Sequence, residues 1–262
     1  MEIRKQKEAE FHDAVRNKKR EDSQESGFIS NRIIYDITRK NQQFIKNFFI
    51  QNCSGKKVLD YCCGDGDTAV LMAEQGATVS GIDISYVSIQ NAKERALKKG
   101  LKSVHFMVMD AERLRFKDKY FDVITCLGVL HHLDIKKAYP ELARVLKLDG
   151  KIICNEPLMY NPVFQLYRRL TPHLRTKWET EHILSRQDIR LAEKYFGKVE
   201  TQFFHLATLF AVPFRYLPGF YFLLGILEKI DSLILRLPLV KWLSWQIVFI
   251  LSEPKKNGKA TF

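Results

Sequence analysis

Three aspartates stand at the ends of apolar runs, and a turn rich in small residues follows the first of them. Asp60 precedes a turn that contains Gly64 and Gly66, while Asp83 and Asp110 end two later apolar runs. A turn with glycines lets the backbone approach a nucleotide-like ligand closely. An acid at the tip of the second strand usually accepts hydrogen bonds from both hydroxyls of a ribose. The pattern therefore indicates a site for a nucleoside-like ligand.

The elements that would hold these residues alternate between strand and helix. Strands are expected at 58–60, 78–84, 104–109, 121–126 and 151–155, and helices at 67–75, 86–99 and 136–147, with a further short one near 111–115. Ser85 is a plausible N-cap of the second helix. Such alternation predicts a parallel sheet with helices on both faces, whose strands all end at one crevice where ligands bind.

The turn resembles the first motif of the class I S-adenosylmethionine-dependent methyltransferases, which is an acid followed by a glycine-rich loop. Asp83 matches the ribose-binding acid of that family, and Asp110-Ala111 matches its adenine-contacting pair. The other matching segments are Asp60-Tyr61-Cys62-Cys63-Gly64-Asp65-Gly66, with Cys62 where the first glycine usually stands, Phe121–Ile124, Leu130-His131-His132, and Leu142–Gly150, where Leu148-Asp149 replaces the common Pro-Gly. The resemblance is close over about residues 45–156. It is specific for the cofactor and nearly silent on the substrate.

The resemblance implies an α/β fold with a doubly wound, seven-stranded, mostly parallel, Rossmann-like sheet. Strand six is expected at 198–205 and strand seven at 246–251, as an antiparallel edge pair. S-adenosylmethionine is the implied cofactor and S-adenosylhomocysteine its product. The residues expected to bind it are Asp60, Tyr61, Cys62, Gly64, Gly66, Asp83, Ile84, Asp110, Ala111 and Leu127.

Methyl transfer to a hydroxyl needs a general base, most often His, Asp or Glu, near the strand tips. His132 is the first candidate and His131 the second, with support of the loop as the alternative role of either. Glu156 could orient the substrate or accept a proton, and His182 could reach over the cleft from a variable connection. No acid stands among the three residues before His132, so no metal is expected.

The chain divides into three expected regions: an N-terminal helical lid (1–50), the cofactor-binding core (51–156), and a substrate-facing part with the last helix and edge strands (157–262). Residues 1–27 are charge-dense and are expected to form either a solvated helix or a partly disordered segment. Residues 28–49 carry apolar residues at helical spacing. Arg32 and Tyr35 in the lid, and Tyr160 after the core, are the candidate substrate contacts.

An apolar insertion of residues 206–245 separates the last two expected strands. Its neighbourhood has uncharged runs of 14 residues (201–214) and 12 residues (216–227). A membrane-spanning helix needs about 20 apolar residues, so no crossing is expected. Three roles remain open: an apolar cap over the active site, a contact with a membrane interface, or an interface between copies of the chain.

The net charge of +12 lies in the flanks, because residues 59–159 hold 14 basic and 14 acidic side chains. A basic flank attracts nucleic acid, an anionic membrane or an acidic substrate, or is simply a solvated surface. The five cysteines lack metal-ligand spacing and fit reduced thiols in a cytosolic protein. Residues 1–8 are charged and lack the apolar stretch of a signal peptide.

Together these features predict a methyltransferase acting on an oxygen, or a nitrogen, of a small hydrophobic or lipid-linked metabolite. It would be cytoplasmic, with possible peripheral contact with a membrane. A nucleic-acid methyltransferase is the first alternative, but Leu127-Gly128-Val129-Leu130 stands where base-modifying enzymes carry an N/D-P-P-Y tetrad. A non-catalytic, membrane-docking protein that keeps the cofactor fold is the second. The acceptor and the oligomeric state are left open.

Overall fold

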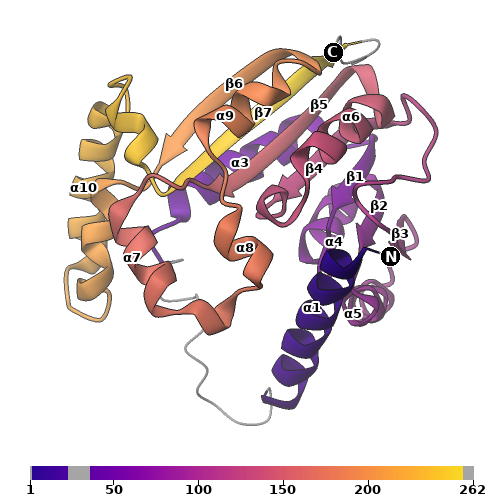
Figure 1. Ribbon diagram of the computed structural model, residues 1–262, viewed down its shortest axis with the longest axis horizontal. Coiled ribbons are helices and arrows are strands. Elements are labelled where there is room, and N and C mark those ends of the chain that lie inside the picture. The colour runs from indigo at the N-terminus through magenta and orange to yellow at the C-terminus, as the bar shows by residue number, and fades with distance from the viewer. Residues whose placement is uncertain (1, 23–35, 256–262) are drawn as a thin grey trace.

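The computed structural model describes residues 2–22 and 36–255, which form one mixed sheet with helices on both faces (Figure 1). The seven strands of this part of the chain lie in the order β3-β2-β1-β4-β5-β7-β6. All neighbouring strands pair in parallel except β7, which is antiparallel to both β5 and β6. The strands are β1 (Lys57–Tyr61), β2 (Thr78–Asp83), β3 (Val104–Val108), β4 (Phe121–Leu127), β5 (Leu146–Pro157), β6 (Phe196–Phe204) and β7 (Gln246–Pro254).

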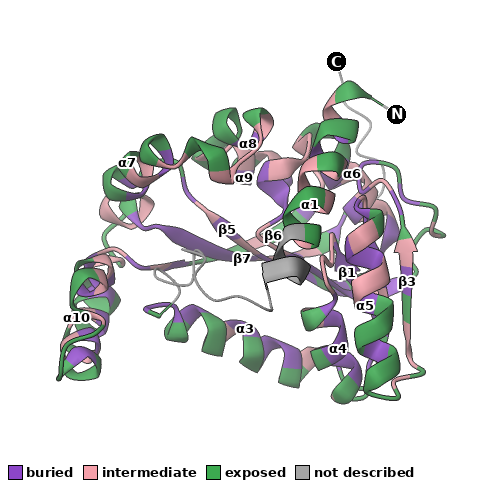
Figure 2. Cartoon of the chain, turned by 90° about the horizontal axis from the view of Figure 1, so that it is seen from below, coloured by how far each residue is buried: buried purple, intermediate pink, exposed green. Residues whose placement is uncertain are grey.

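Two apolar clusters show which helices cover which face of the sheet. One joins the sheet to α3, α4 and α5, and the other joins it to α6 and α9. Figure 2 shows the two helical layers on opposite sides of the sheet. The helices are α1 (Ile3–Asp22), α3 (Arg39–Asn52), α4 (Asp67–Glu74), α5 (Tyr86–Lys98), α6 (Ile135–Val145), α7 (Pro162–Leu170), α8 (Lys177–Glu181), α9 (Arg186–Ala192) and α10 (Phe220–Ile234).

The predicted doubly wound α/β sheet is confirmed, and so is the antiparallel pairing of the last two strands. Central strands covered on both faces must be apolar on both faces, and Val58 and Leu59 of β1 are both fully buried. Ser85 caps α5 as expected, because its side chain accepts a hydrogen bond from the amide of Ser88. Because β1 to β5 are parallel, the loops that follow these strands lie at the same edge of the sheet.

Several expected boundaries were wrong for local reasons. No helix forms at 111–115, because the amides of Glu112 and Leu114 donate to the side chains of Asp110 and Glu141 instead of to helical carbonyls. Strand six ends at Phe204, one residue earlier than expected. His205 follows it with a φ of +66°, outside the strand.

The segment after β5 is more regular than its sequence pattern suggested. Residues 157–184 show no clear apolar period in the sequence, yet they form α7 and α8. Helix α9 ends at Ala192, and Gly197 lies in β6. The insertion between β6 and β7 forms the short helices η3 (Ala207–Phe214) and η4 (Val240–Leu243) around α10. Within the described residues, no helix combines the length and apolarity that a membrane crossing requires.

Candidate active site

A cavity of about 330 Å³ lies at the carboxyl ends of the parallel strands, between the loops after β1 to β4 and helix α1. Ten of the residues singled out from the sequence are among those that line it. They are Asp60, Tyr61, Cys62, Gly64, Asp83, Ile84, Asp110, Ala111, Leu127 and His132. The topology therefore gathers at one place side chains that are up to about seventy positions apart in the chain.

The turn after β1 forms the floor of the cavity and has three residues with positive φ. They are Cys62 (57°), Gly64 (50°) and Gly66 (78°). Gly66 does not line the cavity but caps the start of α4, where a Cβ atom would come within 2.8 Å of the Cβ of Ala92. Glycine is therefore needed at position 66 for space as well as for conformation. Cys62 holds a left-handed conformation that is costly for any residue with a side chain.

Asp83 ties the end of β2 to this turn. Its Oδ2 accepts a hydrogen bond from the amide of Gly64 at 2.9 Å, and its Oδ1 accepts one from the amide of Ser85 at 2.9 Å. Burial raises the pKa of its carboxyl, although these two backbone donors act in the opposite direction. The carboxylate is 8% exposed and borders the cavity, so it can accept further hydrogen bonds from a ligand there.

Asp60 has an unsatisfied oxygen in the cavity wall. Its Oδ1 accepts a hydrogen bond from the hydroxyl of Thr125 at 2.8 Å, whereas its Oδ2 is buried without a hydrogen-bond partner. Burial raises the pKa of Asp60 to about 7, against the lowering effects of Thr125 and the nearby amide of Ala69. Because Asp60 lines the cavity, a positive charge bound there would favour the ionised form of this carboxyl.

Helix α1 closes the cavity. It lies in the region expected as an N-terminal helical lid, but none of its residues was singled out from the sequence as part of the site. Its cavity-lining residues recur on one helical face, and they are Arg4, Lys5, Glu8, His12 and Arg16. This stripe is polar, so a search for apolar periodicity passes over it. The spacing of three and four between charged residues was the signal that could have identified it.

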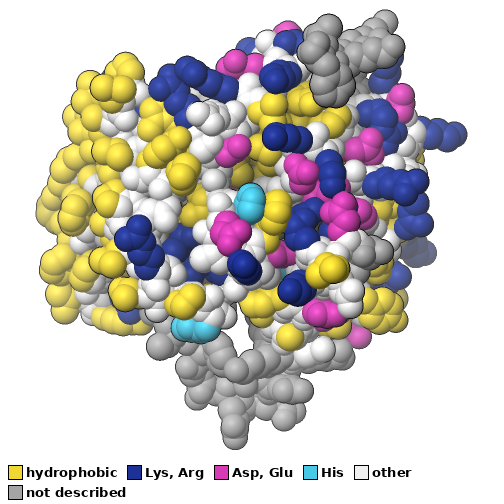
Figure 3. Space-filling model, in the orientation of Figure 1, with side chains coloured by type: hydrophobic (Ala, Val, Ile, Leu, Met, Phe, Trp, Pro, Cys, Tyr) yellow, Lys and Arg dark blue, Asp and Glu magenta, His cyan; other side chains and the backbone are white. Residues whose placement is uncertain are grey.

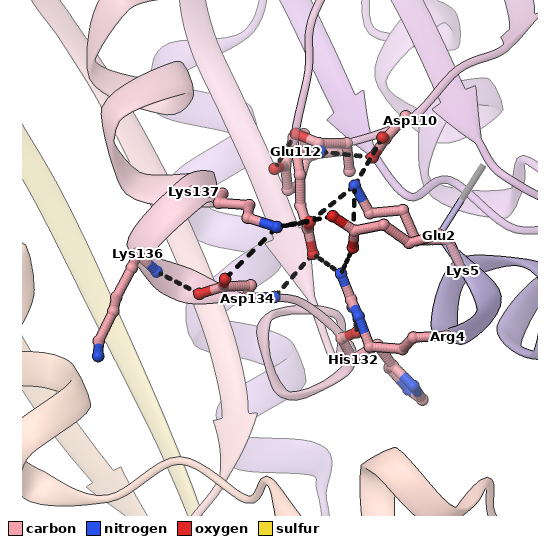
Figure 4. Close-up of polar contacts among 11 residues, drawn as sticks. Glu2, Arg4, Lys5, Asp110, Glu112, His132, Asp134, Lys136 and Lys137 are labelled. Atoms are coloured by element: carbon pink, nitrogen blue, oxygen red, sulfur yellow. Dashed lines mark hydrogen bonds and ion pairs between the residues drawn. The ribbon is translucent and has the colours of Figure 1, made fainter.

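Ion pairs attach α1 to the loop after β3. Figure 4 shows Arg4 and Lys5 reaching from the helix toward Glu112 and Asp110. Arg4 Nη2 lies 2.5 Å from Glu112 Oε1, and Lys5 Nζ lies 2.8 Å from both Glu112 Oε2 and Asp110 Oδ2. Because the Glu112 side chain is only 1% exposed, these are not solvent-screened surface pairs.

His132 points into the cavity beside two residues of α1. Its Nδ1 is hydrogen-bonded to Glu8 Oε2 at 3.2 Å, and Nε2 of His12 lies 3.7 Å from the same oxygen. Burial opposes protonation of His132, but the hydrogen bond to Glu8 and the charges of Glu179, Glu8 and Glu156 outweigh it and raise its pKa. Burial, together with the charge of His132, lowers the pKa of His12 to about 4.

The same three side chains offer the elements of a metal site. Among the described residues, Glu8, His12 and His132 form a group whose potential ligand atoms all lie within 4.8 Å of one another. The expectation that no metal binds considered only the residues before His132 and took no account of α1. It stays a prediction.

His131 and Glu156 form a brace behind the cavity and do not line it. Glu156 is fully buried, and its Oε1 accepts hydrogen bonds from the amides of Val129 and Leu130, both at 2.8 Å. Its Oε2 lies 2.6 Å from His131 Nδ1. With both oxygens engaged, Glu156 holds the loop that carries His132.

The remaining sequence candidates lie elsewhere. His182 is exposed after α8 and stacks on Trp178, with ring centroids 3.5 Å apart. Tyr160 accepts a hydrogen bond from the amide of Arg186 through its hydroxyl and is not part of the cavity wall. Arg32 and Tyr35 lie outside the described residues.

Comparison with known proteins identifies the core that builds this cavity. Residues 59–154 match the family model described as a methyltransferase domain. The uncharacterized methyltransferase YcgJ of Bacillus subtilis is 34% identical over 128 residues, which is 48% of this chain and 50% of the relative. The ubiquinone biosynthesis O-methyltransferase of Salmonella paratyphi A is 37% identical over 99 residues, 37% of this chain and 41% of the relative. This chain thus spans about half the length of the curated relatives that it matches.

The same fold occurs among solved structures. The geranyl diphosphate C-methyltransferase of Streptomyces coelicolor A3(2), solved with Mg²⁺, geranyl diphosphate and S-adenosyl-L-homocysteine, superposes with a TM-score of 0.58. It is 14% identical in sequence, and the match covers 87% of this chain and 85% of that chain. The strand order, the acid-and-glycine turn and the family match lead to one conclusion: residues 59–154 of this chain form a methyltransferase domain.

Proposed function

We propose that this protein transfers a methyl group from S-adenosylmethionine to an oxygen, or a nitrogen, of a small hydrophobic or lipid-linked metabolite. The proposal rests mainly on two buried aspartates, Asp60 and Asp83. They lie at the ends of the adjacent strands β1 and β2, and both line the same cavity. In this proposal Asp83 accepts hydrogen bonds from a ribose. The buried carboxyl of Asp60 favours a cationic ligand, and S-adenosylmethionine carries both a ribose and positive charges.

The cofactor would supply an activated methyl group, so the protein need mainly bind, orient and deprotonate the acceptor. His132 lies in the cavity wall and is supported by Glu8, and we assign to it the removal of a proton from an acceptor hydroxyl. Glu156 and His131 hold the loop of His132 in place. Helix α1, as the lid of the cavity, would exclude water from the reacting groups.

The choice of oxygen and of an apolar acceptor rests on two supports. The relative from Salmonella paratyphi A is named an O-methyltransferase of ubiquinone biosynthesis. The insertion between β6 and β7 carries many exposed apolar side chains on the same chain as the cavity. We place the protein in the cytoplasm with peripheral contact with a membrane. All five cysteines are unpaired, as is usual in a reducing compartment.

Cofactor titration tests the proposal directly. Asp83→Ala should weaken the binding of S-adenosylmethionine about 10- to 100-fold, because it removes charged acceptors of hydrogen bonds. Isothermal titration calorimetry on the whole chain measures this. Asp149→Ala, which removes an exposed aspartate of β5 far from the cavity wall, is the matched control and should bind as the wild type does.

Asp83 also accepts two backbone hydrogen bonds, so Asp83→Asn should be measured beside Asp83→Ala. The amide keeps an acceptor for the turn while removing the charge. If both variants are folded by circular dichroism and bind the cofactor as the wild type does, the ribose assignment is wrong and the proposed activity loses its main support.

A further inference from the structure

The insertion between β6 and β7 leaves an extended apolar surface uncovered. We name it the α10 face and define it as the exposed large apolar side chains of residues 206–243. They are Phe210, Phe214, Tyr216, Leu217, Tyr221, Phe222, Ile226, Ile230, Leu233, Leu237, Leu239 and Leu243. Contiguous apolar surfaces of this extent are rare on monomeric proteins and mark sites of protein or membrane contact.

Helix α10 is apolar on two sides, and only one of them faces the protein. Phe220 and Leu224 pack inward in a cluster with Phe164 of α7 and Trp245 before β7. On the outer side, Phe222, Ile226 and Leu233 recur at helical spacing and are exposed. The inner stripe is sufficient to attach the helix, so the outer stripe is available for another contact.

The acidic and basic side chains of this segment differ in exposure. Its only two acids, Glu228 and Asp231, are buried. Glu228 forms a bidentate pair with Arg39 at 2.6 and 2.7 Å, and Asp231 accepts hydrogen bonds from the amides of residues 206–208. Arg215, Lys229, Arg236 and Lys241 are the basic residues of the same segment, and Lys229 and Arg236 are exposed. The outer surface is therefore apolar and cationic without an acidic side chain of its own.

Helix α7 extends the same surface. Its exposed side chains include Val163, Leu166 and Leu170, and residues 157–178 contain no acid. In Figure 3, hydrophobic side chains cover the left edge of the molecule, where Figure 1 places α10 and α7, and acidic side chains gather on the other half. Aromatic residues at the border, such as Tyr216 beneath Arg215, resemble the belts that settle at lipid headgroups.

We propose that the α10 face docks on the surface of an anionic lipid bilayer, with its apolar side chains in the interface and its basic side chains at the headgroups. The charge pattern favours lipid over a second copy of this chain, because a self-interface would bring two cationic surfaces together. Docking would be peripheral, since no described helix is long and apolar enough to cross a membrane.

Vesicle flotation of the whole chain tests this inference. The wild type should float with vesicles of phosphatidylcholine and phosphatidylglycerol in a 3:1 ratio at low salt. It should bind pure phosphatidylcholine at least about fivefold less, because each basic residue near an anionic surface contributes about that factor. Added salt should weaken the binding. Absence of flotation on anionic vesicles at low salt would overturn the inference.

Matched surface variants locate the contact. Phe222→Ser removes a side chain that is 77% exposed on α10, and its control, Leu97→Ser, removes one that is 80% exposed on α5. A double variant, Lys229→Glu with Arg236→Glu, reverses two basic charges of the α10 face. Its control is the double variant Lys93→Glu with Lys98→Glu on α5. The α10 variants should lose at least about fivefold in vesicle affinity, and the α5 variants should not.

Two outcomes count against lipid docking. Equal losses in the α5 variants would show general electrostatic adsorption, and a dimer in light scattering that Phe222→Ser dissociates, without vesicle binding, would assign the face to a second copy. The inference deepens the membrane contact of the proposed function, but its test does not require methyl transfer. Because the α10 face does not line the cavity, all four variants should keep the wild-type affinity for S-adenosylmethionine, so failure of one proposal leaves the other measurable.

Discussion

At the scale of single residues, the site combines carboxylates that differ in how well they are satisfied. Asp83 has donors on both oxygens, whereas Asp60 has one oxygen without a donor and a pKa raised to about 7 by burial. Such a group is unfavourable in the free protein and becomes favourable when a cation arrives. The buried charge of Asp60 therefore lowers the stability of the free protein, and a bound cation would remove this penalty.

Asp60→Asn tests this trade-off. The native carboxyl keeps its proton up to about pH 7, whereas an unfolded one loses it near pH 4, so the free energy of unfolding falls between these pH values. The variant lacks this term. Its melting temperature should exceed that of the wild type by at least about 3 °C at pH 8 and match it near pH 4.

The same variant should bind S-adenosylmethionine at least about tenfold more weakly at pH 8, because the amide carries no charge. Differential scanning calorimetry and titration calorimetry provide the two readouts. A variant that is less stable than the wild type at pH 8, with unchanged affinity, would contradict the assigned state of Asp60.

The protonation of His132 also depends on pH, but here the main cause of the raised pKa is a neighbouring carboxylate and not burial. The carboxylate of Glu8 supports the protonated imidazole and helps to raise its pKa, so Glu8→Gln should lower the pKa of His132. Proton NMR of the histidine ring, assigned by its loss in His132→Ala, measures the shift without any substrate. If the pKa of His132 is unchanged in Glu8→Gln, Glu8 does not support the proposed base.

With an acceptor in hand, His132→Ala should lower kcat by about 10²- to 10⁴-fold and leave cofactor affinity unchanged. The rising limb of the pH–kcat profile should move to lower pH in Glu8→Gln. His182→Ala, an exposed histidine outside the cavity wall, is the control and should be fully active. Equal activity of His132→Ala and His182→Ala would exclude His132 as the base.

At the scale of elements, residues 1–50 were expected to form a helical lid, but the residues of α1 that line the cavity were not identified from the sequence. Strand ends and the glycine turn follow from local rules: apolar runs form strands, and positive φ requires small residues. Helix α1 packs through polar contacts made across more than one hundred positions, such as Lys5 with Asp110. Contacts of this kind leave no periodic apolar signal, so the sequence left a solvated helix and a partly disordered segment as the two alternatives for residues 1–27.

Two other candidates from the sequence, Glu156 and His182, do not line the cavity. Glu156 follows a strand tip as a substrate-facing acid would, but both its oxygens are used by the loop of His132. His182 is near acidic and aromatic residues in sequence, and it stacks on Trp178 instead of reaching the cavity. Chain position locates a residue near an edge, but the direction of its side chain depends on partners that are distant in the sequence.

Glu112→Gln is the matching test of α1 as a lid. The substitution should weaken the contacts of residue 112 with Arg4 and Lys5, because a neutral amide replaces the buried carboxylate that forms both ion pairs. Hydrogen exchange in residues 3–17 should quicken at least about tenfold, and cofactor affinity should fall with it. Glu200→Gln, which alters an exposed pair with Lys198 on β6, is the control. Unchanged exchange in Glu112→Gln would show that α1 is held mainly by other contacts.

At the scale of the whole molecule, the two proposed surfaces lie on different parts of one sheet. The cavity is built at the carboxyl ends of β1 to β4, whereas the α10 face belongs to the insertion that follows β6. The charge follows the same division, since residues 59–159 are neutral and residues 160–262 hold 15 basic and 8 acidic side chains. The core shared with the matched methyltransferases and the cationic apolar surface can therefore vary independently.

The turn that contains Cys62 and Cys63 has a further consequence for the chain itself. Both sulfhydryls border the space assigned to a sulfonium, and a thiolate there would be the strongest nucleophile within reach. Burial raises the pKa of both thiols well above that of free cysteine, so each keeps its proton. In the proposed reaction, the protonated state of these thiols would protect the protein from methylating itself and would keep the methyl donor for the acceptor.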